Sequence, residues 1–140
     1  MHPANAEAFM AFDVGLKRTG VAVGSQHSGG AEPLTTLIGK SGQLDWEQVD
    51  RLLETWAPNL CIIGDPKTTN PHLNKLIRRL THHLQVNGFR VVMVDEHLTS
   101  VAANAHLADT DYSTAQRQEK RDQVAACLIL ERYLESRTPN

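Results

Sequence analysis

The sequence of 140 residues lacks the features that mark membrane proteins and strongly basic nucleic-acid binders. No apolar run approaches the roughly 20 residues needed to cross a bilayer, so we expect no membrane contact. The formal net charge is −2, which argues against holding nucleic acid through a general positive field but leaves room for a local basic patch. With 41% hydrophobic and 21% charged residues, the composition is instead that of a soluble globular protein.

Cysteine is scarce, and no spacing typical of a zinc site is present. Cys61 lies in an expected strand and Cys127 in an expected helix, and neither belongs to a CxxC motif. Because free cysteine is often buried, we interpret both as small core residues rather than as a disulfide or metal site. The seven histidines form no HxxxH pattern, and His82 and His83 would point to different sides of a helix, which argues against zinc.

The length allows one hydrophobic core but not two full lobes. The N-terminal MHPANAEAF has neither the basic start nor the apolar stretch of a signal peptide, so we expect a tail at residues 1–8 and a cytoplasmic protein. We place a single domain at 9–136 and a second short tail at 137–140. A cleft between large domains would then require an oligomer, and the sequence leaves monomer and homodimer open.

The spacing of apolar residues predicts an α/β domain with a mixed five-stranded sheet. Three short runs come first and indicate an antiparallel meander, and two buried strands then alternate with helices, which places helices on both faces. The expected strands span residues 9–14, 19–24, 34–39, 59–66 and 90–96. The expected helices run from the N-cap Asp45 to Pro58, from about Leu73 to Leu84, over 100–108, and from about Gln118 to Glu135, the last with an apolar segment at 124–130.

Carboxylates stand at three places where burial is costly. Asp13 lies inside the first strand, Asp95 and Glu96 end the last strand, and Asp122 precedes the apolar segment of the last helix. A buried carboxylate costs several kcal/mol unless it is paired, hydrogen-bonded or bound to a cation. Asp13, Glu96 and Asp122 could meet around one point and hold Mg²⁺ or Mn²⁺, and two such ions can promote phosphodiester hydrolysis.

Each carboxylate also has a purely structural interpretation. Asp13 could accept backbone N–H groups in the turn beside Gly15. Asp122 could favour a helix N-terminus through the helix dipole. Strand alternation lets only one of Asp95 and Glu96 point into a site, and the sequence leaves open which one does.

Several basic side chains could contact phosphate, although solvated surfaces often look the same. Lys17 and Arg18 lie in the turn after Asp13. A stripe on the second helix and a cluster before Asp122 are also basic; they comprise Lys75, Arg78, Arg79 and His82, and Arg117, Lys120 and Arg121, respectively.

Five motifs follow one another along the chain: AFDVGLKRTGVAVG, the DW…LL…W…P helix, IIGDP, VDEHLTS and RDQVAACLIL. Their order and spacing match those of one protein family. Together the five motifs cover about residues 8 to 135. In this combination the sequence resembles the YqgF (RuvX) family, which are RuvC-like nucleases linked to pre-16S rRNA and are also described as Holliday junction resolvase-like.

This resemblance implies a ribonuclease H-like fold and divalent-metal-dependent cleavage of a nucleic-acid backbone, in 5′-end maturation of 16S rRNA in the bacterial cytoplasm. It implies metal-binding and catalytic roles for Asp13, Glu96 and Asp122, with Asp95 as the alternate to Glu96. The expected cofactor is Mg²⁺ or Mn²⁺. Pre-rRNA is the expected partner ahead of branched DNA, with the small ribosomal subunit as a further partner. The expected substrate contacts are Lys17, Arg18, His97, Lys120 and Arg121.

Three departures from the family pattern bear on function. The family usually reads GLPLNMDGT after the fourth strand, where this chain reads GDPKTTNPH with Asp65 at a usually apolar position. His97 replaces a usual arginine, and Gln123 a usual serine. The altered GDPKTTNPH and DEH segments keep open a non-catalytic RNA- or ribosome-associated module. A Holliday junction resolvase-like DNA endonuclease is a further alternative, because the sequence leaves the natural substrate open between an RNA end and branched DNA. A nucleotide-binding ATPase or sugar kinase would share the DxGxxxxG pattern. These proteins need two lobes and a second phosphate loop, and this chain has the length for one lobe and no second glycine-rich loop, which argues against this class.

Overall fold

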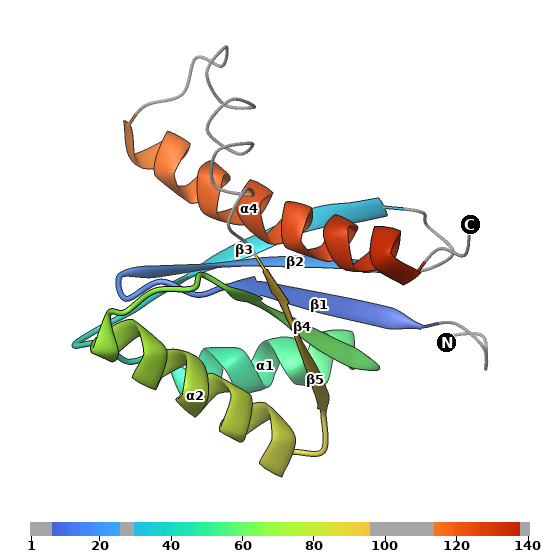
Figure 1. The fold of residues 1–140 in the computed structure, drawn as a ribbon, viewed down its shortest axis with the longest axis horizontal. Helices are drawn as coiled ribbons and strands as arrows, with labels where there is room; N and C mark the ends of the chain where they lie inside the picture. Colours follow the sequence, from blue (N-terminus) through green and yellow to red (C-terminus); the bar gives the residue numbers. More distant parts are fainter. Residues whose placement is uncertain (1–6, 26–29, 96–113, 138–140) are drawn as a thin grey trace.

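The computed structural model describes residues 7–25, 30–95 and 114–137, which build a mixed sheet with helices on both faces (Figure 1). The strands are β1 (Ala8–Asp13), β2 (Arg18–Ser25), β3 (Gly30–Ile38), β4 (Leu60–Asp65) and β5 (Arg90–Asp95). Their order across the sheet is β3-β2-β1-β4-β5. β1, β2 and β3 pair antiparallel, whereas β4 pairs parallel with both β1 and β5. The predicted meander and crossovers are therefore confirmed.

Within the described residues, α1 (Trp46–Trp56) and α2 (Pro71–Val86) cover one face of the sheet and α4 (Thr114–Arg137) covers the other (Figure 1). The predicted N-cap of α1 is confirmed, because the Asp45 side chain accepts a hydrogen bond from the Gln48 backbone N–H at 3.3 Å. Ala57 ends α1 in the left-handed conformation, immediately before Pro58.

Strand alternation divides the core between the two faces of the sheet. Met10 and Phe12 of β1 pack into the cluster under α1 and α2. Phe9 and Ala11 point the other way and pack with Ile129 of α4. Asp13 follows Ala11 by two residues, so its side chain lies on the same face of the sheet as Phe9 and Ala11, the face that α4 covers.

Both cysteines are buried and free, as predicted. Burial raises the pKa of the Cys61 thiol from 9.0 to about 12. Burial, and secondarily the charges of Glu131 and Glu32, raises the pKa of Cys127 to about 12. Neither thiol is therefore suited to nucleophilic chemistry, because the reactive form is the thiolate.

Three sequence-based expectations differ from the structure. The strand expected at 90–96 was predicted to be buried, but β5 lies at a sheet edge and the Met93 side chain is 45% exposed. β3 begins at Gly30 rather than at residue 34, since an edge strand tolerates Pro33, which faces Ala22 where the register shifts. α4 begins at Thr114, four residues before the expected start at Gln118.

Some expectations fall on residues that the structure does not describe. The helix expected over 100–108, most of the N-terminal tail and the last three residues of the chain lie outside the described ranges. Within the described ranges, no helix combines the length and apolar character needed to span a membrane.

Candidate functional site

Asp13 is the last residue of β1 and lies where the parallel strands β1, β4 and β5 have their C-terminal ends. Its side chain is half-buried and, because side chains alternate along a strand, lies on the face covered by α4. Across the antiparallel pair it is in register with Gly20 of β2. The turn that follows is held by Thr19, a buried residue whose hydroxyl lies 3.4 Å from both the backbone nitrogen and the oxygen of Gly15.

Asp122 of α4 lies directly over the same glycine. A methyl group at Gly20 would overlap the carbonyl group of Asp122 and come within 3.0 Å of the Gln123 nitrogen. The backbone of α4 therefore rests on β2 at this point, which only a residue without Cβ permits. Because Asp13 is the register partner of Gly20, the structure brings Asp13 and Asp122 to one neighbourhood at the end of the sheet.

Arg18 links the hairpin turn to Asp122. Its Nε donates a hydrogen bond to Asp122 Oδ2 at 2.9 Å, and the two side chains are 26% and 13% exposed. Gln123, one of the departures from the family pattern, also attaches α4 to the sheet, since its Nε2 donates to Thr36 Oγ1 at 3.1 Å. These two contacts fix the segment of α4 that carries the candidate carboxylate.

The other predicted phosphate contacts are placed less tightly. Lys17 is exposed in the β1–β2 turn, and its carbonyl oxygen accepts a hydrogen bond from Gly39 N–H at 2.8 Å. Lys120 is exposed and Arg121 half-buried, just before Asp122 on α4. Glu96 and His97 lie outside the described residues.

Asp95 and Asp65 are register partners at the ends of β5 and β4. Asp95 alternates in phase with Val91, which packs against the cluster under α1 and α2, so it lies on the face opposite Asp13. Among the side chains described, those of residues 7–25, 30–95 and 120–137, no three His, Cys, Asp or Glu form a metal-binding group. The predicted set includes Glu96, so it is not contained in those ranges.

The divergent loop after β4 is organised by its own polar side chains. Asp65 Oδ1 accepts a hydrogen bond from Lys67 N–H at 3.0 Å, and Lys67 Nζ lies 3.4 Å from Asp65 Oδ2. Asn70 then caps α2 by accepting hydrogen bonds from the His72 and Leu73 N–H groups. Asp65 therefore acts as a turn-forming residue. From the sequence it was recognised only as an aspartate at a position that is usually apolar in the family.

Comparison with solved structures first gives the class of fold. The crystal structure of the fowlpox virus Holliday junction resolvase aligns with a TM-score of 0.60 at 18% identity, covering 92% of this chain and 99% of that one. Thermus thermophilus RuvC, solved with a Holliday junction substrate, aligns with a TM-score of 0.56 at 12% identity, covering 94% and 95%. These likenesses confirm the ribonuclease H-like fold.

Sequence comparison then gives the family. Residues 7–136 match the family model RuvX, described as Holliday junction resolvase. A Nitrosospira multiformis protein named "Putative pre-16S rRNA nuclease" is 36% identical over 95% of this chain and 91% of its own length. A Nitrosococcus oceani protein of the same name is 38% identical over 94% and 89%. The chain belongs to the RuvX family.

Proposed function

We propose that this protein is a metal-dependent nuclease that hydrolyses phosphodiester bonds of pre-16S rRNA during maturation of its 5′ end. The RuvX match and the names of the relatives at 36% and 38% identity support a nuclease of this kind. The structural observation that carries the proposal is the position of Asp13 and Asp122 beside and above Gly20. Such an enzyme would act in the cytoplasm, where rRNA is processed, with the small ribosomal subunit as its setting.

The donor set fits a hard divalent cation. Asp13 and Asp122 offer carboxylate oxygens, the ligands that Mg²⁺ and Mn²⁺ prefer. Arg18 engages one carboxylate oxygen of Asp122 and so orients the group from the side of the hairpin. When bound, such an ion would supply Lewis-acid activation of water and of the phosphate.

Glu96 is our candidate for the third carboxylate, in preference to Asp95. Asp95 lies in phase with Val91, on the face of α1 and α2, whereas Val92 and Val94 belong to the cluster on the face of α4. Strand alternation favours the residue in the Val92 and Val94 series for a site shared with Asp13. Substituting Glu96 and Asp95 one at a time therefore tests which of the two adjacent acids belongs to the site.

The proposed substrate contacts are basic side chains and one histidine close to the candidate acids in the fold or in the sequence. Arg18 lies within hydrogen-bonding reach of Asp122, and Lys17 belongs to the same exposed turn. Lys120 and Arg121 precede Asp122 on α4, and His97 follows Glu96 in the sequence. These side chains would balance the charge of the phosphates that approach a cluster of carboxylates.

The test is cleavage of a structured pre-16S rRNA fragment with Mn²⁺ or Mg²⁺, compared with EDTA. We expect the wild type to cut the fragment only with metal, and Asp13→Asn and Asp122→Asn to lose activity. Asp45→Asn is the matched control, because asparagine caps a helix about as well as aspartate and Asp45 is the N-cap of α1. If wild type and Asp13→Asn bound the RNA equally and neither cut it, the protein would be a non-catalytic RNA-binding module.

The description of the matching family favours one second candidate, a Holliday junction resolvase-like DNA endonuclease. Resolving a four-way junction requires two symmetric cuts, hence a dimer. Paired assays with a synthetic junction and the pre-rRNA fragment separate the two substrates. Symmetric cutting of the junction, with intact RNA, would replace the rRNA proposal.

A further inference from the structure

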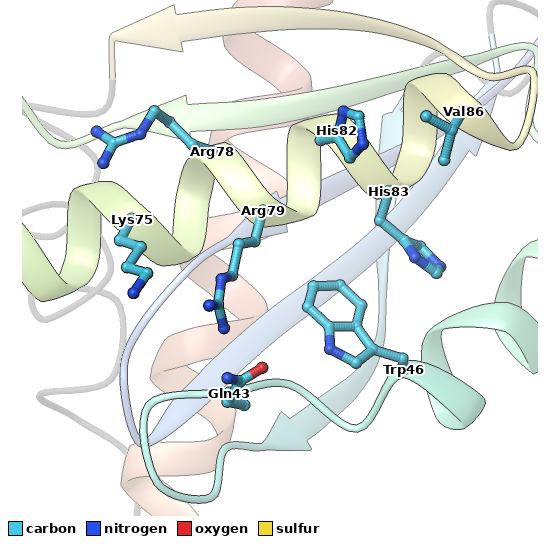
Figure 2. Close-up of a pocket in the computed structure, with 8 residues that line it drawn as sticks. All are labelled: Gln43, Trp46, Lys75, Arg78, Arg79, His82, His83 and Val86. Carbon is cyan, nitrogen blue, oxygen red and sulfur yellow. The ribbon is translucent and has the colours of Figure 1, made fainter.

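A pocket of about 590 Å³ lies between α2 and the segment that enters α1, on the face of the sheet opposite α4. Figure 2 shows Lys75 and Arg79 extending from α2 toward Gln43, while Trp46 and His83 face each other beside them. The proposed cleavage site does not use these side chains.

The helix that forms one side of the pocket is basic. Residues 66–94 contain five Lys or Arg side chains and no Asp or Glu, in a chain whose net charge is −2. Lys75, Arg78 and Arg79 are exposed, and none forms an ion pair with a carboxylate in the described part of the chain. This part of α2 therefore carries positive charge that the described carboxylates do not neutralise by direct pairing.

Two aromatic rings line the pocket beside these cations. The rings of Trp46 and His83 lie 4.7 Å apart between centroids and are tilted by 32°. His83 Nε2 lies 2.7 Å from Asp50 Oδ1 on α1, which holds the imidazole in place and occupies that carboxylate. Cationic side chains beside an aromatic surface are the combination that single-stranded nucleic acids bind, through phosphate and base respectively.

Backbone hydrogen bonds connect the pocket to the candidate site. Gln43 and Lys40 exchange backbone hydrogen bonds of 2.9 and 3.1 Å. The neighbouring Gly39 donates a backbone hydrogen bond to Lys17 O, in the turn that also leads to Arg18 and its ion pair with Asp122. The pocket and the candidate site are thus joined by one short path of contacts along the edge of the sheet.

We propose that this pocket binds the sugar–phosphate backbone of a single-stranded stretch of the nucleic-acid substrate, away from the bond that is cut. Lys75 and Arg79 contact phosphates, and Trp46 offers an apolar surface to a base. The proposal rests on the proposed function for the nature of the substrate. It concerns affinity rather than hydrolysis, so the two can fail separately.

The experiment measures the affinity of the full chain for a fluorescent single-stranded RNA oligomer by anisotropy, in EDTA, between about 50 and about 200 mM KCl. The test variant carries Lys75→Ala and Arg79→Ala. The matched control carries Arg51→Ala and Arg132→Ala, which remove the same charge from exposed positions that do not line the pocket. Arg51 lies five residues after Trp46 on α1, about 140° around the helix from it, and Arg132 lies ten residues, about 15 Å, beyond Asp122 on α4.

We expect the test variant to bind roughly tenfold more weakly at low salt, with the slope of log Kd against log salt reduced by about 1.4, or about 0.7 for each lost phosphate contact. A charge-preserving variant, Lys75→Arg with Arg79→Lys, should bind like the wild type. Equal affinity and equal slope in the test and control variants would overturn the proposal. Equal loss of affinity in the charge-preserving and alanine variants would also overturn it.

Two further outcomes separate the alternatives. If the test variant kept its RNA affinity but lost binding to poly-glutamate, the pocket would bind an acidic protein and the proposal would be wrong. If the wild type cut no RNA while the test variant still lost affinity, hydrolysis would fail as a function and the pocket would stand.

Discussion

Replacing Gly20 by alanine tests the geometry on which the candidate site depends. The added methyl would overlap the carbonyl group of Asp122 and lie 3.0 Å from the Gln123 nitrogen. These are backbone atoms of α4, so no flexible side chain can swing away. Restoring ordinary contact requires α4 and β2 to separate by about 1.5 Å or more. Overpacking of this kind typically costs about 1–3 kcal/mol.

The expected loss is therefore a free energy of unfolding lower by about 1–2 kcal/mol, because alanine in a strand regains about 0.5–1 kcal/mol of backbone entropy. Urea unfolding measures this change. The displacement also moves Asp122 relative to Asp13, and a misplacement of about 1 Å can reduce a rate about 100-fold. Cleavage of the pre-16S rRNA fragment measures that second effect.

Gly30→Ala is the matched control. Gly30 begins β3, and a methyl group there would meet nothing within 4 Å. We expect this variant to be as stable as the wild type or slightly more stable, with full activity. If Gly20→Ala matched Gly30→Ala in both stability and activity, the close approach of α4 to β2 would not be what positions Asp122, and the reasoning would be refuted.

Three other perturbations follow from the same structure. Glu96→Gln should abolish cleavage whereas Asp95→Asn should leave it near the wild-type rate; the reverse result would place the third carboxylate on the other residue. Arg18→Gln should lower the free energy of unfolding by about 1–2 kcal/mol, less than the loss of a fully buried ion-pair partner, since the Arg18 side chain is 26% exposed; an unchanged urea midpoint would show that the pair contributes nothing. Burial raises the pKa of Cys61 and Cys127 from 9.0 to about 12, so the unfolded chain loses these protons at a lower pH than the folded one. The free energy of unfolding should therefore fall as pH rises from 9 toward 12, by up to about 1.4 kcal/mol per thiol per pH unit. Urea unfolding across that range measures the slope, and rapid labelling of either thiol in the native protein near pH 8 would contradict the burial.

The local pattern of the sequence was sufficient wherever neighbouring residues alone decide the outcome. Asp45 caps α1 as predicted, because an N-cap depends on residues within one turn. The run at 90–96 shows the opposite case. Its valines and methionine suit a central or an edge strand equally, and the exposure of Met93 follows from which strands flank β5, which no local pattern contains.

The basic stripe on α2 is a similar case. The sequence identified Lys75, Arg78, Arg79 and His82 as one helical face. The structure confirms that all four side chains are exposed, and none forms an ion pair with a carboxylate in the described part of the chain. Only the packed helices show that Trp46 and His83 stand beside this face and turn it into a pocket.

The sequence by itself determined the strand and helix order, the family, and the short set of acids from which a metal site could be built. Only the tertiary structure decided that Asp13 and Asp122, 109 positions apart, adjoin the same glycine. It also placed Asp95 on the opposite face of the sheet. The physical reason is that periodicity is a property of neighbouring residues, whereas the approach of α4 to β2 depends on the missing Cβ of Gly20 and on packing between segments distant in the chain.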